Sequence, residues 1–157
     1  MAQREASYKK VITVNRKANF EYFVQEKFEA GIVLLGSEIK SIRANNFSLN
    51  DAYVEETDGE LYLIHCHIAE YKQASQFNHD PLRRRKLLLR RKQMNKIVGL
   101  LRTKGLTVVP LNAFFNNKNI MKLEIAVAKG KKEYDKRESI KQQDWNRQKA
   151  RVLKGDS

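Results

Sequence analysis

Cysteine, proline and long apolar runs are nearly absent from this sequence of 157 residues. Cys66 is the single cysteine, so no disulfide can form within the chain, and we expect a reducing, cytoplasmic compartment. No apolar run approaches the roughly 18 residues that a transmembrane helix needs. The polar residues 1–10 predict a flexible leader that does not resemble a signal peptide. A chain of this length can bury a core without disulfides or metal. The apolar content is compatible with the monomer that we expect, and the lack of long apolar runs predicts no membrane partner.

Motifs for phosphate binding and catalysis are missing as well. The run 129–132 contains a Gly-Lys pair, but Ile125 stands where a P-loop has its first glycine, and Lys132 replaces the Ser or Thr that binds magnesium. The acidic residues are scattered, whereas a metal-dependent nuclease needs clustered carboxylates. We therefore expect no catalytic residues, no metal and no cofactor, and an RNA-processing enzyme is the weakest functional hypothesis.

His65, Cys66 and His67 are the one local group with metal-binding chemistry. If they form a strand, both histidines share one of its faces and could chelate a metal. A zinc site needs three or four protein ligands, and no third ligand with suitable spacing is evident. Cys66, placed in the middle of this strand, has no charged sequence neighbour that would activate its thiol. We favour the interpretation that these are polar residues on a strand over a metal-binding or catalytic site.

Positive charge, in contrast, is abundant and segregated. The chain has 31 Lys and Arg against 18 Asp and Glu, a net charge of +13. Residues 83–104 contain ten basic groups and no acid, residues 129–157 contain ten basic and five acidic groups, and the rest carries a net charge of −2. Solubility alone does not require such segregation. Two focused basic segments predict a polyanionic partner, most often a nucleic acid.

The pattern of residues 11–129 predicts one mainly β unit, a small barrel with peripheral helices. A first helix follows Gly36 with Ser37 as its N-cap, and a second covers 90–103 with Gly105 as its C′ residue. Asp58-Gly59 predicts a hairpin turn and 116–119 a second turn. The expected strands are 11–14, 22–24, 32–35, 51–55, 60–64, 106–110 and 121–127.

After Gly130 the large apolar residues become sparse. Residues 130–157 cannot bury enough apolar surface to fold alone, so we predict a basic tail that is disordered when free. Few helix breakers occur before Gly155, which would allow this tail to become helical against a partner.

Nucleic-acid contacts can be assigned only loosely from these patterns. Lys40 and Arg43 share the polar side of the first helix and form a candidate phosphate-contact edge, although an ordinary solvated helix face is the more frequent alternative. Aromatic rings could stack on bases, but in short strands they more often belong to the core. The candidates for stacking are Tyr8, Phe20, Tyr22, Phe77 and Tyr134.

Seven strings, taken together, carry a resemblance to a known family. They occur at 15–18 (NRKA), 28–32 (FEAGI), 36–43 (GSEIKSIR), 51–53 (DAY), 80–89 (DPLRRRKLLL), 105–110 (GLTVVP) and 128–137 (AKGKKEYDKR). In this order and spacing the chain resembles the bacterial SsrA-binding protein family, also called small protein B or SmpB, from Asn15 to Leu153. Each string is moderately specific, and the ordered set is highly specific.

The resemblance implies an OB-fold-like β-barrel with added helices and a non-enzymatic role in trans-translation. Members of the family bind the tRNA-like domain of transfer-messenger RNA and, with elongation factor Tu, bring it to stalled ribosomes. The protein stands in for the anticodon arm that this RNA lacks. Its tail lies in the empty message channel beside the decoding region and is helical there, and the unfinished protein is then tagged for degradation as the ribosome is released.

The resemblance also implies which residues contact RNA. Lys40, Arg43 and Lys122 would pair with phosphates. Glu29 would accept hydrogen bonds from a base edge or a ribose hydroxyl, or orient a neighbouring lysine. Leu88 would pack under an unstacked base, and a core position for this leucine is an equal alternative.

In the tail, the resemblance implies a segment that acts on the ribosome. Tyr134 stands where some members have histidine, which is compatible with stacking on ribosomal RNA and not with proton transfer at neutral pH. The matching residues are Gly130, Lys131, Lys132, Tyr134, Asp135, Lys136, Arg137, Trp145, Val152 and Leu153. A ribosomal or assembly protein that binds structured RNA permanently is the alternative function with the same charge pattern, and it would track ribosomes in all growth states.

Overall fold

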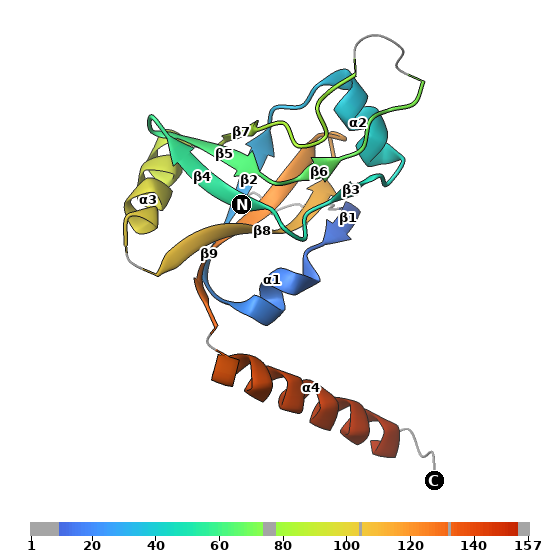
Figure 1. The fold of residues 1–157 in the computed structure, drawn as a ribbon, viewed down its shortest axis with the longest axis vertical. Coiled ribbons are helices and arrows are strands. Elements are labelled where there is room, and N and C mark those ends of the chain that lie inside the picture. The colour runs from blue at the N-terminus through green and yellow to red at the C-terminus, as the bar shows by residue number, and fades with distance from the viewer. Residues whose placement is uncertain (1–9, 74–77, 104, 132, 154–157) are drawn as a thin grey trace, which may run out of the picture.

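A computed structural model describes residues 10–73, 78–103, 105–131 and 133–153 and confirms a mainly β barrel with helices at its periphery (Figure 1). The main sheet has the strand order β1-β8-β4-β5-β7-β2-β9, and pairing of β8 with β9 closes it. Its strands are β1 (Lys10–Val14), β2 (Tyr22–Ile32), β4 (Tyr53–Thr57), β5 (Glu60–Ile64), β7 (Arg85–Leu88), β8 (Leu106–Phe115) and β9 (Met121–Gly130). A small second sheet pairs β3 (Phe47–Ser48) with β6 (His67–Ile68). The helices are α1 (Arg16–Glu21), α2 (Gly36–Arg43), α3 (Arg91–Leu101) and α4 (Glu133–Leu153).

Strand β2 is one long strand that contains the predicted strand 22–24, so the predicted break after residue 24 and the predicted strand at 33–35 are wrong. Its polar residues read as a break in the sequence, but they belong to a strand with one solvated face: Lys27 and Glu29 are exposed, whereas Phe28 and Ala30 are buried. The register with β9 shifts between Val24 and Glu26, a bulge of the kind that bends a strand around a barrel.

The two predicted turns are confirmed. Asp58 and Gly59 join β4 to β5 with φ values of 53° and 79°, the left-handed conformation that a tight two-residue hairpin requires. The turn at 116–119 joins β8 to β9, and Asn119 has a φ of 62°. Both strands of this second hairpin are longer than predicted, reaching Phe115 and Gly130.

Helices α2 and α3 occur where predicted, but their ends differ. The N-cap of α2 is Leu35, whose backbone N–H donates to Glu38 Oε1 at 2.8 Å, so the assignment of Ser37 as N-cap is wrong. Ser37 Oγ instead lies 2.8 Å from His79 Nδ1. The C-cap of α3 is Arg102, so the C′ position is Thr103. Gly105 has a φ of 85° but lies two residues further along, so the prediction of Gly105 as C′ is wrong.

Helix α1 was not predicted, and buried Asn15 explains how it is held. The Asn15 side chain accepts a hydrogen bond from the Ala18 N–H at 3.2 Å and so caps the helix. It also donates to the carbonyls of Leu49, at 3.1 Å, and Pro110, at 2.8 Å. One side chain thus ties α1 to β8 and to the loop that precedes β4.

The core lies inside the barrel, and α3 packs against it. Met94 and Ile97 of α3 are buried among the barrel residues, as the helical spacing predicted. The opposite face of α3 presents Lys92 and Lys96 to solvent. Fully buried members of this core include Leu61, Leu63, Leu87, Ile97, Leu123 and Ile125.

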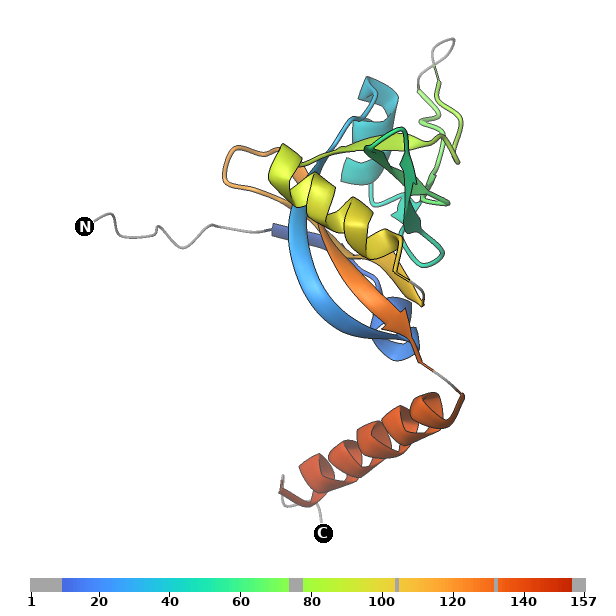
Figure 2. The same cartoon turned by 90° about the vertical axis from the view of Figure 1, so that its left-hand side faces the viewer.

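Helix α4 leaves the lower end of the barrel and projects away from it (Figure 2). Just before it, the Lys131 N–H donates to the Glu21 carbonyl at 2.7 Å, which fixes the exit of the chain beside α1. Gln143 and Arg147 of α4 share a shallow hollow with Phe20 of α1. The structure shows the tail in a helical form, and its disorder in the unbound protein stays a prediction. No described helix is long and apolar enough to cross a bilayer.

Candidate nucleic-acid interface

Gly31 of β2 lies between Leu88 of β7 and Lys122 of β9, because it is the cross-strand partner of both. A Cβ atom on Gly31 would lie 3.3 Å from Leu88 Cβ and 3.5 Å from Lys122 Nζ. The missing side chain therefore leaves an opening on the barrel wall that any other residue would begin to fill.

This opening is a hollow of about 530 Å³, which we call the Gly31 hollow. Three residues expected to contact RNA meet here from three strands, namely Glu29, Leu88 and Lys122. The full lining is Glu29, Gly31, Leu88, Leu89, Arg90, Gln93 and Lys122. Glu29 shares its face of β2 with Gly31, since residues two apart in a strand point the same way.

The position of Leu88 settles the alternative between core and surface. Its side chain is 51% exposed, whereas its neighbour Leu87 is fully buried. Alternation along β7 sends Leu87 into the barrel and Leu88 outward. The core alternative for Leu88 is wrong, and an exposed leucine in a polar hollow provides an apolar surface on which an unstacked base can pack.

The charges around the Gly31 hollow favour an anion. Arg90 and Lys122 contribute two positive charges to its lining and Glu29 one negative charge. Arg91 and Lys92 follow at the exposed start of α3. The hollow therefore combines basic groups that attract phosphate with one carboxylate and one leucine that can contact a base or ribose.

Lys40 and Arg43 lie apart from this group. Both are exposed in the last turn of α2, and Lys40 Nζ lies 5.5 Å from the centre of the Tyr71 ring. None of the described residues that line the Gly31 hollow comes from α2. The structure thus places the five expected RNA contacts at two locations.

The basic segment 83–104 is less available to RNA than its sequence indicates, because Arg85 is entirely buried. Arg85 Nε donates to Glu38 Oε2 at 2.5 Å, and Arg85 Nη1 donates to the Cys66 carbonyl at 2.7 Å. Arg83 donates to the other oxygen of Glu38 at 2.6 Å. Arg85 of β7 and Arg83, two residues before it, thus hold α2 in place and are structural, a role that sequence reasoning missed.

Glu38 is kept ionised by these partners. Burial of its carboxyl favours the neutral form, but hydrogen bonds from Arg83, the Leu35 N–H and Arg85 outweigh burial and lower its pKa below the usual 4.5. Among the described residues, no buried side-chain nitrogen or oxygen lacks a hydrogen-bond partner. The network is therefore satisfied internally and does not offer a site for a ligand.

The group at residues 65–67 differs from its prediction. His65 lies in the turn between β5 and β6 with a φ of 58°, and its ring stacks on Tyr53 at 5.6 Å between centroids, so the two histidines do not share a strand. Cys66, also outside the strands, is buried, which raises the pKa of its thiol to about 11 and keeps it protonated at neutral pH. Within the described ranges, no three metal-ligating side chains gather.

The described tail residues lie at the end of β9, just after it at Lys131, and on α4. Gly130 ends β9, and Lys131 follows with its ammonium 5.1 Å from the centre of the Phe23 ring. Arg137 and Trp145 are exposed on α4, Trp145 to 56%. Lys132, like Tyr8 and Phe77, lies outside the described residues. The backbones of the remaining residues lie in α4, but their side chains are outside the described part: Tyr134, Asp135, Lys136, Val152 and Leu153.

A closed β-barrel with a basic hollow on its wall and a basic helical extension defines a small nucleic-acid-binding barrel protein. Within this class, residues 12–155 match the family model described as SmpB protein. The chain therefore belongs to the SmpB protein family, as the sequence resemblance predicted.

Individual relatives agree with this assignment. The chain is 55% identical to the SsrA-binding protein of Wolbachia pipientis subsp. Culex pipiens (strain wPip), covering 93% of this chain and 98% of that protein. It is 53% identical to the SsrA-binding protein of Orientia tsutsugamushi (strain Boryong), covering 94% of this chain and 97% of that one. A solved structure of tmRNA-SmpB in the bacterial ribosome contains a similar chain, with a TM-score of 0.64, 39% identity, and coverage of 81% of this chain and 85% of that one.

Proposed function

We propose that this protein is the RNA-binding adaptor of trans-translation in its cell. It binds the tRNA-like domain of transfer-messenger RNA, substitutes for the missing anticodon arm, and delivers the RNA to stalled ribosomes so that the nascent chain is tagged for degradation. Family membership supports this role, as do relatives named for SsrA binding and a similar chain solved with tmRNA in the ribosome.

One structural observation carries the assignment of the RNA face. Glu29, Leu88 and Lys122 come from sequence positions far apart, yet they line one hollow around Gly31. Lys122 and Arg90 bind phosphates there, Glu29 accepts from a ribose hydroxyl or a base edge, and Leu88 packs under a base. Lys40 and Arg43 on α2 form a separate phosphate contact.

The remaining partners follow from this role. The protein works as a monomer in the cytoplasm and meets elongation factor Tu only through the charged RNA. On the ribosome, α4 lies in the message channel next to the small-subunit decoding region, and Trp145, exposed on α4, contacts ribosomal surfaces there. The adaptor itself performs no chemistry, since peptidyl transfer belongs to the ribosome.

Binding to the isolated tRNA-like domain, compared with ordinary tRNA and with duplex RNA across a salt series, tests the proposal. We expect tight, selective binding to the tRNA-like domain. Lys122→Ala removes a phosphate contact and should weaken binding and reduce its salt slope by about one. The double variant Lys40→Ala with Arg43→Ala, measured in the same binding assay, tests separately whether α2 contacts the RNA.

Lys118→Ala is a matched control for charge, because Lys118 is exposed in the turn between β8 and β9 and does not line the hollow. It should leave selectivity intact. Equal binding to all three RNAs with the same steep salt slope would instead show that the charge acts without selectivity, and a permanently bound ribosomal protein would become the better hypothesis.

A further inference from the structure

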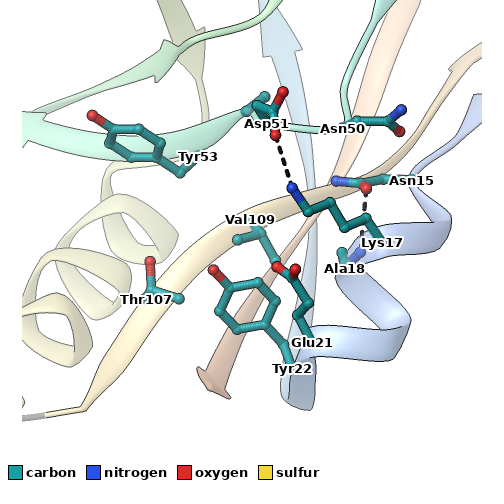
Figure 3. A pocket seen from close by; sticks show the side chains of 11 residues that line it. Asn15, Lys17, Ala18, Glu21, Tyr22, Asn50, Asp51, Tyr53, Thr107 and Val109 are labelled. Carbon is teal, nitrogen blue, oxygen red and sulfur yellow. Dashed lines mark hydrogen bonds and ion pairs between the residues drawn. The ribbon is translucent and has the colours of Figure 1, made fainter. Parts of the chain in front are cut away.

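A second hollow lies at the other end of β2, between α1, β8 and the start of β4 (Figure 3). Its volume is about 220 Å³, smaller than the roughly 300 Å³ at which pockets for whole small molecules begin. Tyr22 lies seven positions before Glu29 on the same strand, and the two hollows have no described lining residue in common. This hollow, which we call the Tyr22 hollow, is therefore separate from the Gly31 hollow.

The walls of the Tyr22 hollow are polar and aromatic. Figure 3 shows the rings of Tyr22 and Tyr53 on different sides of the space, the hydroxyl of Thr107 nearby, and the ion pair of Lys17 with Asp51 opposite Thr107. Lys17 Nζ lies 2.9 Å from Asp51 Oδ1, and both side chains remain largely exposed.

The charge of this lining is opposite to that of the molecule. Lys17 contributes one positive charge, whereas Glu21 and Asp51 contribute two negative charges. A net negative lining on a chain of charge +13 disfavours a phosphate group. Carboxylates accept hydrogen bonds only, so they favour a ligand group that presents N–H donors.

Asn15 does not contribute to ligand binding, although it lines the hollow. Its side-chain nitrogen donates to Leu49 and Pro110, and its oxygen accepts from Ala18. Asn15 therefore fixes the position of α1, and with it that of Lys17 and Glu21, relative to β8. The hydrogen bonds of Asn15 therefore hold the polar groups that α1 contributes to the hollow in place.

We propose that the Tyr22 hollow binds one unstacked guanine base of an RNA segment. The Watson–Crick edge of guanine presents two N–H donors beside an oxygen acceptor, which matches carboxylates next to an ammonium group. Asp51 and Glu21 accept from N1–H and the 2-amino group, and Lys17, which retains donors beyond its bond to Asp51, donates to O6. The tyrosine rings supply stacking surface.

This inference rests on the proposed RNA-binding function and extends it. The two hollows share none of their described lining residues and would bind different nucleotides, so the barrel would contact two RNA segments at once. The Gly31 hollow would bind phosphate and ribose through a net positive lining, and the Tyr22 hollow would read a base through a net negative one.

Titration of the full-length wild-type protein with three pentaribonucleotides tests the inference without any mutation. The probes are UUGUU, UUAUU and the inosine form UUIUU, which lacks only the 2-amino group of guanine. Amide shifts followed by NMR separate the two hollows, because Asp51 and Thr107 report on one and Leu88 on the other. We expect UUGUU to saturate the Asp51 and Thr107 shifts at about tenfold lower concentration than UUIUU or UUAUU.

Asp51→Asn then removes one carboxylate, and Glu55→Gln is its matched control. Glu55 is an exposed acid on β4 outside the hollow, so both variants raise the net charge by one. We expect Asp51→Asn to lose most of the preference for guanine over inosine, while Glu55→Gln retains it. Glu55→Gln should also bind the tRNA-like domain as the wild type does, because Glu55 lines neither hollow.

Two outcomes overturn the inference. Equal saturation by the three oligonucleotides would show that the hollow does not read a base. Shifts at Asp51 and Thr107 produced by arginine methyl ester, with no guanine preference, would assign the hollow to a cationic protein side chain. If the wild type does not bind the tRNA-like domain selectively, the proposed function is contradicted instead. The oligonucleotide titration tests the guanine inference separately, so the two failures can be told apart.

Discussion

Glu38 on α2 and Arg85 on β7 form an ion pair in which both side chains are fully buried, with Nε and Oε2 2.5 Å apart. Arg83 adds a second cation to the same carboxylate at 2.6 Å. The pair joins the helix to the barrel wall beside the strand that carries Leu88. Burying two charges is costly, and this arrangement persists because each charged group has several hydrogen-bond partners.

Replacing Glu38 with Gln should strongly destabilise the fold, because it leaves the Arg85 charge buried without its counter-ion. We expect a loss of about 3–5 kcal/mol in the free energy of unfolding, measured by urea denaturation. Asp51→Asn breaks the exposed ion pair with Lys17 and is the matched control, with little expected change because water screens an exposed pair. Similar losses in both variants would contradict the structural role assigned to Glu38.

Stability should also depend on pH through Glu38. Its pKa is lower in the folded protein than the usual 4.5, so its contribution is fully present above about pH 4.5 and is lost as the pH falls toward the folded-state pKa. The difference in unfolding free energy between wild type and Glu38→Gln should therefore shrink as the pH falls below 4.5. Urea denaturation of both proteins between pH 3 and pH 7 measures it, and a constant difference would contradict the assignment.

The buried arginine shows what local sequence patterns cannot reveal. Residues 83–86 read as four adjacent cations for RNA, but Glu38, the partner of Arg85, is 47 positions away. Asp58-Gly59, in contrast, was predictable because the turn depends on two neighbouring residues with positive φ. Helix α1 was missed because it has only six residues and is held in place by long-range bonds from Asn15.

Gly31→Ala should reduce RNA binding while the protein remains folded. The new Cβ would lie 3.3 Å from Leu88 Cβ, so its neighbours must move by a few tenths of an ångström and the Gly31 hollow becomes shallower. We expect a change in unfolding free energy within about 1 kcal/mol. Alanine loses less conformational entropy than glycine when it folds into a strand, and this gain offsets the crowding against Leu88. Affinity for the tRNA-like domain, measured by filter binding, should fall about tenfold if one contact worth about 1.4 kcal/mol is lost.

Gly99→Ala is the matched control for this substitution. Gly99 lies on α3, and a Cβ there would meet nothing within 4 Å. It should stabilise the protein by about 1 kcal/mol or less and leave RNA affinity unchanged. If Gly31→Ala binds RNA as Gly99→Ala does, the Gly31 hollow is not the RNA site.

The resemblance alone implied that Glu29, Leu88 and Lys122 contact RNA, and the strand pairing shows that they converge on one hollow. The pattern Leu87-Leu88-Leu89 is uniformly apolar, so periodicity did not indicate which leucine faces out. Pairing of β7 with β2 at Gly31 and Leu88 decides it. Lys40 and Arg43 on α2 do not line this hollow, and this too depends on the tertiary structure, which local sequence patterns do not predict.

Leu88→Ala should separate RNA binding from stability. Leu88 is already 51% exposed, so truncation should cost about 1 kcal/mol or less in unfolding free energy. Loss of the surface under an unstacked base should lower affinity for the tRNA-like domain by about tenfold, a base-stacking contribution of 1–3 kcal/mol being typical. Leu82→Ala, at a leucine that is 53% exposed outside the Gly31 hollow, should leave affinity unchanged, and equal losses in both variants would remove Leu88 from the site.

Removal of residues 133–157 should separate RNA binding from ribosome rescue. The cut retains Gly130, which pairs with Tyr22, and Lys131, whose N–H donates to Glu21, so the barrel keeps its last strand and its contact with α1. Because α4 projects from the barrel and the Gly31 hollow contains no residue of α4, affinity for the tRNA-like domain should stay within about twofold, a change of roughly 0.4 kcal/mol. Tagging of nascent chains on stalled ribosomes in a reconstituted system should be abolished, since the proposed occupant of the message channel is gone. Normal tagging by the truncated protein would show that α4 has no part in rescue, whereas loss of RNA affinity would show that the barrel alone is not the RNA-binding unit.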